Sequence, residues 1–198
     1  KIPENVDDQT ASFTVLASIS LQGIRLASPN IGETVVVIGL GILGLLAVQI
    51  LIANGCRVIA IDLEEAKCSL ASDYGAISIN SSKDSNHVET IKELTDGYGA
   101  DSILITANSK DDDIIHQSAE ICKQRGKIVL VGVVDLNIRR DDFYKKEIVF
   151  QVSSSYGPGR YDRNYEKKGI DYPYGFVRWT EKRNFQTILE MMSGDKIN

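Results

Sequence analysis

Short apolar runs alternate with longer mixed stretches along most of the chain. The apolar runs are rich in β-branched residues, which is typical of strands covered on both faces. The predicted strands are residues 34–39, 57–62, 76–79, 101–107, 127–132 and 147–153.

The mixed stretches between these runs place apolar residues at helical spacing, and several end at glycine or asparagine. The predicted helices are residues 42–55, 64–75, 84–96, 111–124 and 180–193. Because strands alternate with helices, the fold class is α/β, with a parallel sheet, right-handed crossovers and helices on both faces.

A helical lead-in is predicted ahead of the first strand, over residues 7–28. Asp7 and Asp8 can cap its first turn, and Pro29 and Gly32 end it. Its apolar residues fall at helical spacing and predict the buried face: Phe13, Leu16, Ile19 and Ile24.

Composition changes near residue 155. Residues 1–155 carry a net charge of −7, whereas residues 156–198 carry +2 and hold five of the eight tyrosines and the only tryptophan. We predict a first domain over 1–155 and an aromatic-rich C-terminal extension over 156–198. The extension has no clean period before its final helix, and we expect it to return toward a catalytic domain that this chain does not contain.

Overall composition excludes several classes of protein. A net charge of −5 argues against a nucleic-acid surface, and no apolar run approaches the roughly 20 residues that span a bilayer. The chain starts at Lys1 with no signal-peptide pattern, so we expect a piece trimmed from a longer cytoplasmic protein.

The metal-ligating residue types are sparse and scattered. Cys56, Cys68 and Cys122 form no C-x-x-C pair and fit a reducing compartment. With only His87 and His116 besides, the sequence predicts no metal site within this chain.

The stretch VIGLGILG, residues 37–44, carries the clearest chemical signal. Gly39 allows a tight turn, Gly41 allows a pyrophosphate to approach, and Gly44 allows the following helix to pack on the strand. The helix N-terminus then offers the N–H groups of Ile42 and Leu43 to an anion. This pattern predicts a doubly wound Rossmann sheet with strand order 3-2-1-4-5-6.

Asp62 ends the next predicted strand, 18 residues after Gly44. Its carboxylate can accept hydrogen bonds from both ribose hydroxyls and would repel a 2′-phosphate, which favours NAD over NADP. The alternative is a structural turn with a solvated aspartate. Lys67 could reach the same ribose, or could be an ordinary exposed lysine.

Two further strand ends lie where the nicotinamide half of the cofactor is expected. Ala107 follows the fourth predicted strand and Gly132 ends the fifth. Their small size fits a flat ring, but they could also be ordinary strand ends. Neither histidine lies at the carboxyl end of a strand, so no catalytic acid or base is predicted.

In combination, GETVVVIGLGILG, GADSILITA and GKIVLVG resemble the cofactor domain of the medium-chain (zinc-type alcohol dehydrogenase) superfamily, over residues 1–155. The resemblance implies a separate β-rich catalytic domain ahead of this one. It also implies that Ser18 contacts the nicotinamide and that Thr14 stands where the family has a zinc-ligating cysteine. Threonine is a poor zinc ligand, so this departure puts a catalytic zinc in doubt.

The lead-in and the tail GPGRYD further resemble a bacterial branch in which a dehydrogenase-like half is joined to a sugar-oxidoreductase-like half. The tail supplies aromatic and charged residues that could bind a sugar or a nucleotide-sugar, or could pack between domains. These residues are Arg160, Tyr161, Arg178, Trp179 and Glu181.

These observations predict the NAD-binding domain of an oxidoreductase that moves hydride between nicotinamide and an alcohol, carbonyl or sugar substrate, and that is inactive as an isolated chain. A non-catalytic NAD(H) sensor is the alternative, and an S-adenosylmethionine-dependent methyltransferase fits less well. The apolar stretch EIVFQVSS, 147–154, could form an exposed edge strand that pairs two copies into a homodimer.

Overall fold

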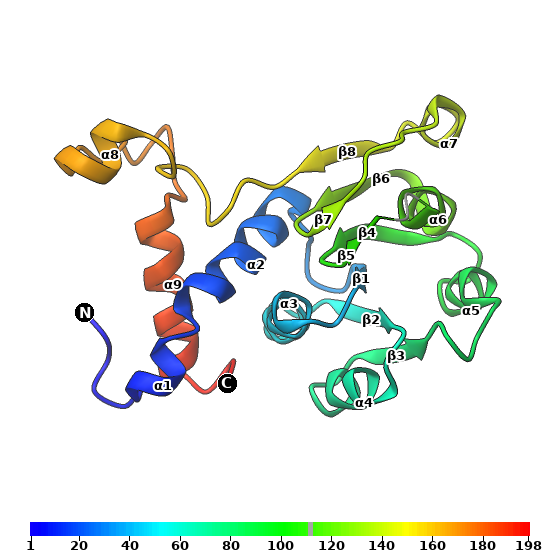
Figure 1. Cartoon of the computed structure of the whole chain (residues 1–198), viewed down its shortest axis with the longest axis horizontal. Helices are drawn as coiled ribbons and strands as arrows, with labels where there is room; N and C mark the ends of the chain where they lie inside the picture. Colours follow the sequence, from blue (N-terminus) through cyan, green and yellow to red (C-terminus); the bar gives the residue numbers. More distant parts are fainter. Residues whose placement is uncertain (111–112) are drawn as a thin grey trace.

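A six-stranded parallel sheet forms the centre of the computed structural model, which describes residues 1–110 and 113–198 (Figure 1). Its strands, in spatial order, are β3 (Ile77–Asn80), β2 (Arg57–Asp62), β1 (Thr34–Ile38), β4 (Ala100–Ile105), β6 (Cys122–Leu130) and β8 (Val149–Val152). This is the third, second, first, fourth, fifth and sixth of the predicted strands, so the predicted order is confirmed.

The central strand β1 shows why apolar runs form this sheet. Val36 of β1 pairs with Ile59 of β2 on one side and Ile103 of β4 on the other, and all three are fully buried. Successive side chains point to opposite faces, so Val35 and Val37 belong to one core and Val36 to the other. Both faces must therefore be covered by helices.

Helices cover the two faces in separate layers (Figure 1). One layer holds α2 (Thr14–Ala27), α3 (Ile42–Ala53) and α4 (Glu65–Asp73), and the other holds α5 (His87–Leu94) and α6 (Asp113–Ile121). The short helix α7 (Arg140–Tyr144) packs against α6. Residues 111–112 of the predicted helix 111–124 lie outside the described residues, and its last three residues belong to β6.

The predicted lead-in helix is two helices, α1 (Asp8–Ala11) and α2. Asp7 caps α1 by accepting a hydrogen bond from the Thr10 N–H at 2.9 Å. The break follows from local hydroxyl bonds, since the Ser12 Oγ donates to the Gln9 carbonyl and the Thr14 Oγ1 to the Ala11 carbonyl.

The predicted buried face of the lead-in was partly wrong. Phe13 precedes α2 and is exposed, whereas Ile24 is buried as expected. The helix begins at Thr14, and its buried apolar side chains are Ala17, Leu21, Ile24 and Ala27.

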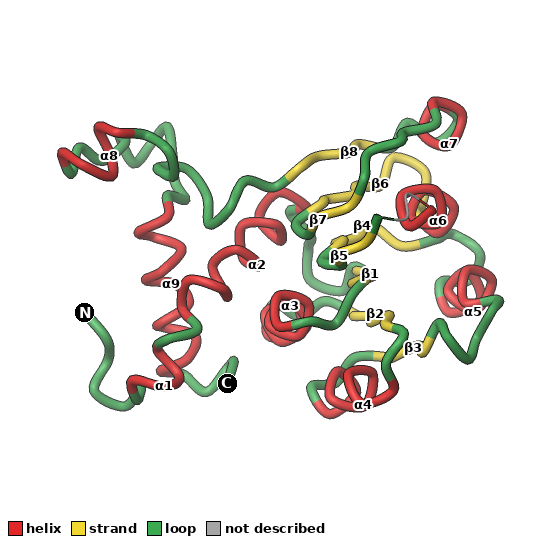
Figure 2. The backbone as a smooth tube through the Cα atoms, viewed as in Figure 1, coloured by secondary structure: helices red, strands yellow, loops and turns green. Residues whose placement is uncertain are grey.

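The C-terminal segment is mostly loop, with one short helix and one long one (Figure 2). The short helix, α8 (Arg163–Lys168), was not predicted, whereas α9 (Glu181–Ser193) was. Helix α9 packs against α2 through its buried residues Asn184, Ile188 and Met192.

Hydrogen bonds attach the N-terminal segment to α9 and the C-terminal residue to α3. The Asn5 side chain donates to the Ser193 carbonyl at 2.8 Å, and the Gln49 side chain exchanges hydrogen bonds with the backbone of Asn198. None of the described helices is long and apolar enough to cross a membrane.

Candidate functional site: a crevice at the glycine loop

The glycine loop, residues 39–44, joins β1 to α3 with almost no room for side chains. Gly39 has φ 93°, and a Cβ there would lie 2.6 Å from the Ala107 Cα. A Cβ on Gly44 would lie 1.9 Å from the Gly39 carbonyl oxygen. At Gly41, by contrast, a Cβ would meet nothing within 4 Å. Two glycines are therefore required by the fold itself, and the middle one faces open space.

Helix α3 starts directly at this open position. Gly41 is its N-cap, no side chain caps it, and the Leu45 N–H makes the bond to the Gly41 carbonyl. The N–H groups of the first turn have no partner within a helix, and with the helix dipole they present partial positive charge. The loop therefore offers an anion a backbone cradle without side-chain obstruction.

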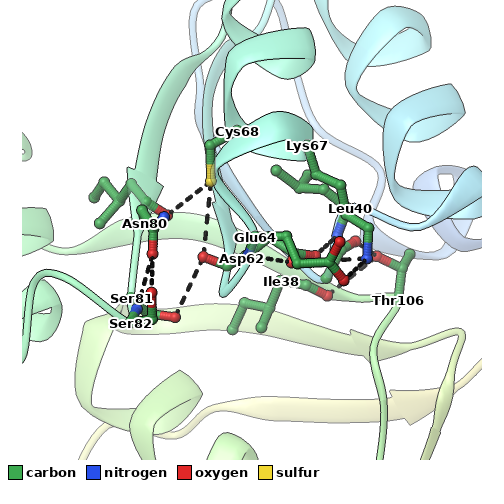
Figure 3. A network of polar contacts seen from close by, with 12 residues as sticks. Ile38, Leu40, Asp62, Glu64, Lys67, Cys68, Asn80, Ser81, Ser82 and Thr106 are labelled. Carbon is green, nitrogen blue, oxygen red and sulfur yellow. Dashed lines mark hydrogen bonds and ion pairs between the residues drawn. The ribbon is translucent and has the colours of Figure 1, made fainter.

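Asp62 lies beside this cradle at the end of β2 (Figure 3). One carboxylate oxygen accepts from the Leu40 N–H at 2.6 Å, and the other accepts from the Glu64 N–H at 3.0 Å. Its side chain is only 11% exposed. Each oxygen can still accept a further hydrogen bond, so the fixed carboxylate can bind donor hydroxyls.

Lys67 lies at the edge of the same site, on the first turns of α4. Its Nζ is 2.6 Å from a Glu64 carboxylate oxygen and 3.9 Å from the Asp62 Oδ1. The hydrogen bond to Glu64 is the main reason why the pKa of Lys67 is raised, with a smaller contribution from Asp62. Lys67 therefore remains charged and adds a cation next to the carboxylate.

A cavity of about 610 Å³ opens above these groups, at the carboxyl ends of the strands. Gly39, Gly41, Asp62, Lys67 and Ala107 all line it, so the structure brings five of the predicted residues together. Parallel α/β sheets bind ligands at this edge.

The far wall of the cavity comes from residues that the sequence did not point to. His87 of α5 approaches Gln117 of α6, with the His87 Nε2 3.1 Å from the Gln117 Oε1. Ser81 also lines the cavity, and so does Asn108, which follows Ala107 at the strand end where the sequence places the far half of the cofactor. The sequence signal was weak, because a lone histidine at a helix start indicates a site only once the facing helix is known.

The other predicted residues do not line this cavity. Gly44 is packed beneath the loop, Leu43 accepts a hydrogen bond from the Ser20 hydroxyl through its carbonyl, and Ile42 is exposed on the first turn of α3. Ile42 and Leu43 can therefore contribute to the cradle only through their backbone N–H groups, which lie at the start of α3.

Ser18 and Gly132 are also away from the cavity. Ser18 is fully buried, and its hydroxyl donates to the Thr14 carbonyl within α2. Gly132 stacks on Ala107, where a Cβ would lie 2.0 Å from the Ala107 carbonyl oxygen. The residues that follow Ala107 and Gly132 form a short two-stranded ladder that was not predicted, β5 (Asn108–Ser109) with β7 (Val133–Val134). Gly132 thus supports the wall that Ala107 presents.

The charged and aromatic residues of the tail lie elsewhere. Arg160 pairs with Glu166 at 2.6 Å, whereas Arg178 contacts the rings of Tyr174 and Trp179. None of them lines the crevice.

A parallel sheet in the order 3-2-1-4-5-6, a glycine-rich turn and an acidic strand end define a Rossmann-type nucleotide-binding domain. The family model described as zinc-binding dehydrogenase matches residues 43–171. The chain belongs to that family, which confirms the resemblance drawn from its motifs.

One relative is similar to this chain in sequence, and two solved structures are similar to it in fold. Sorbitol dehydrogenase of Halalkalibacterium halodurans is 28% identical over 166 residues, which are 81% of this chain and 48% of that protein. A structure described as a short chain alcohol dehydrogenase from E. coli CFT073, in complex with NADH, has a TM-score of 0.78 at 23% identity. A putative zinc-binding dehydrogenase from Sinorhizobium meliloti 1021, bound to NADP, has a TM-score of 0.78 at 21% identity.

The two structural matches cover the whole of this chain but only 51% and 52% of the other chains. The chain therefore spans about half the length of the proteins that it matches.

The zinc in the family's description does not fit this chain's own residues. No three His, Cys, Asp or Glu side chains among the described residues are grouped so as to hold a metal ion. The Thr14 hydroxyl donates to the Ala11 carbonyl at 2.6 Å. The three cysteines are buried, and burial raises the pKa of Cys122 to about 12, so it is a neutral thiol. The described residues do not by themselves form a zinc site.

Proposed function

We propose that this chain is the NAD(H)-binding domain of an oxidoreductase, with the pyrophosphate at the start of α3 and the adenosine ribose on Asp62. The observation that carries the proposal is the fixed Asp62 carboxylate beside an uncapped helix N-terminus and an open Gly41. A carboxylate at this point favours a free 2′-hydroxyl over a 2′-phosphate, which supports NAD as the cofactor.

The roles of the chain follow from the geometry. The N–H groups of Ile42 and Leu43 would bind the diphosphate, and Gly39 and Gly44 would keep the loop close to it. Ala107, supported by Gly132, would form part of the wall toward the nicotinamide. When bound, the nicotinamide supplies the carbon that gives or takes hydride, and the chain's contribution is to orient that ring.

The substrate that we propose for the whole protein is an alcohol or carbonyl compound of the sugar class. The relationship to a sorbitol dehydrogenase supports this class. The described crevice contains no group that we assign as a catalytic acid or base, so we expect the isolated chain to bind NADH without oxidising alcohols. Its three free thiols support a reducing, cytoplasmic setting.

A titration of NADH by its fluorescence tests the site. Asp62→Asn keeps an acceptor for the Leu40 N–H but removes the charge, and we expect NADH to bind about tenfold more weakly while NADPH loses less or gains. Glu89→Gln is the matched control, because Glu89 is an exposed carboxylate that does not line the crevice. An unchanged NADH affinity in Asp62→Asn would refute the ribose assignment.

We also propose that two copies pair through β8, which lies at the end of the sheet. Val149 and Val152 on this strand are 51% and 53% exposed, and an unpaired apolar edge favours strand pairing. Light scattering should give a dimer mass for the chain and a monomer mass for Val149→Lys/Val152→Lys. A monomeric parent chain would reject this proposal without affecting the first.

A further inference from the structure

The peptide unit between Gly39 and Leu40 is held at both of its polar ends. Its N–H belongs to Leu40 and donates to an Asp62 carboxylate oxygen at 2.6 Å (Figure 3). Its carbonyl belongs to Gly39 and accepts from the Thr106 hydroxyl, also at 2.6 Å. Asp62 ends β2, and Thr106 directly follows β4. Because β2 and β4 lie on the two sides of β1, the start of the glycine loop is fixed from both neighbours of the strand that precedes it.

The Thr106 hydroxyl has one proton, and the Gly39 carbonyl is its nearest acceptor. The other carbonyl within reach, that of Ile38, is 3.1 Å from the hydroxyl and already accepts from the Thr106 N–H at 2.8 Å. Gly39 contributes little to the orientation of the peptide unit, because a glycine adopts many backbone conformations at little cost. The hydroxyl therefore supplies an orienting contact that the backbone preference of Gly39 does not.

This contact reaches Asp62 through the peptide unit. A peptide unit is planar, so its carbonyl and its N–H point in opposite directions and turn together. A bond that fixes the Gly39 carbonyl therefore also fixes the Leu40 N–H and, through it, one oxygen of Asp62. The second oxygen of Asp62 is held separately by the Glu64 N–H at 3.0 Å. The Thr106 hydroxyl thus acts on the carboxylate without any need to touch a ligand in the cavity that both residues line.

We propose that Thr106 is a positioning residue for the cofactor. Through the peptide unit it holds Asp62 where the carboxylate accepts from the free hydroxyls of a ribose and repels a 2′-phosphate. A displaced carboxylate would bind the ribose less well and oppose the 2′-phosphate less strongly, because Coulomb repulsion falls with distance. This inference rests on the proposed NAD(H) function and deepens it, because it assigns part of the choice between NADH and NADPH to a hydroxyl at the end of β4.

Fluorescence titrations of the chain with NADH and with NADPH test the assignment. Thr106→Val keeps the shape of the side chain and removes its donor, so we expect NADH to bind about fivefold more weakly and NADPH to change by less than about twofold. Thr106→Ala removes the donor without placing a methyl group against the carbonyl, and should shift the preference in the same direction. Thr106→Ser restores the donor and should recover the NADH affinity of the parent chain.

Thr187→Val is the matched control. The Thr187 hydroxyl also donates to a backbone carbonyl, that of Arg183 at 2.9 Å, but it lies on α9 and does not line the crevice. This variant should bind both dinucleotides as the parent chain does. Circular dichroism checks that each variant is folded.

The double variant Asp62→Asn/Thr106→Val separates positioning from a general effect on the fold. If Thr106 acts through the Asp62 charge, removal of its hydroxyl from the Asp62→Asn chain should change the ratio of NADH affinity to NADPH affinity by less than about twofold. A hydroxyl with a structural role alone would weaken NADH and NADPH equally in both backgrounds.

Three results would overturn the inference and leave the proposed function intact. They are parent-like NADH affinity in Thr106→Val and Thr106→Ala, equal losses of NADH and NADPH affinity in these variants, and an undiminished shift in preference in the Asp62→Asn background. A parent chain that does not bind NADH, or an Asp62→Asn chain that binds it as tightly as the parent, would reject the proposed function and this inference together.

Discussion

The glycine loop and the helix α9 both pack against α2, but different parts of the chain hold them there. The loop is fixed by its backbone, because Gly39 and Gly44 leave no space for a Cβ and the Ser20 hydroxyl binds the Leu43 carbonyl. Helix α9 is fixed by side chains, among them the buried Asn184 in its first turn. One region fails when an atom is added, and the other fails when a polar atom is removed.

The difference follows from what each region has to do. A backbone cradle must leave room for a ligand, so it relies on missing side chains. A helix that packs against another helix buries polar groups of both, and each of these groups needs a hydrogen-bond partner. Four substitutions can break or sharpen this contrast.

Gly44→Ala should have the largest effect. The new methyl group would lie 1.9 Å from the Gly39 carbonyl oxygen, which is backbone and cannot turn away. We expect the free energy of unfolding to fall by about 3 kcal/mol or more, measured by urea denaturation. A loss below about 1 kcal/mol would mean that the loop is not tightly packed.

Asn184→Ala should have the next largest effect. Asn184 accepts from the Arg25 Nε at 2.8 Å and donates to the Tyr156 carbonyl at 2.9 Å, and its removal leaves both groups without that partner. We expect a loss of about 2 kcal/mol in the same denaturation experiment. Asn164→Ala on the exposed helix α8 should cost much less, and equal losses would contradict a special role for Asn184.

Gly41→Ala should separate binding from stability. Its φ of −67° suits any residue, and a Cβ there meets nothing within 4 Å, so the free energy of unfolding should change by less than about 0.5 kcal/mol. The methyl group would occupy the space of the diphosphate, and we expect NADH to bind at least tenfold more weakly in a fluorescence titration. Unaltered NADH affinity would place the diphosphate elsewhere.

Glu181→Gln should have the smallest effect and a defined pH dependence. One carboxylate oxygen of Glu181 is buried without a hydrogen-bond partner, and burial raises the pKa of this group. A carboxyl with a raised pKa in the folded state stabilises the protein most when it is protonated, and this contribution is lost as the pH rises.

We therefore expect Glu181→Gln to stabilise the protein at pH 7 by up to about 1 kcal/mol, with the gain disappearing below pH 4.5. Thermal unfolding at a series of pH values measures the effect. A gain that is constant with pH would show that the charge of Glu181 is not its cause.

The sheet and the glycine loop could be read from the sequence because local patterns determine them. The strands β1, β2 and β4 carry apolar runs that are buried on both faces, Gly39 and Gly44 leave no room for a Cβ, and Asp62 ends β2. The strand order and the place of Asp62 beside the loop followed from these features.

The far wall of the crevice, the short ladder and the contacts of the C-terminal segment could not be predicted, because they depend on packing between segments that are distant in the sequence. His87 and Gln117 meet only because α5 and α6 lie side by side, and the two-residue ladder of β5 with β7 is too short to leave a pattern. Helix α8 has no apolar period and relies on the Asp162 side chain as its cap. The sequence around Asn184 has no pattern that predicts its hydrogen-bond partners on α2 and at Tyr156.

A crystal structure of the chain with NADH tests the central claim most directly. The account predicts diphosphate oxygens within hydrogen-bond distance of the Ile42 and Leu43 N–H groups, and ribose hydroxyls on the Asp62 carboxylate. NADH bound away from the glycine loop, or an empty crevice in crystals saturated with NADH, would contradict it.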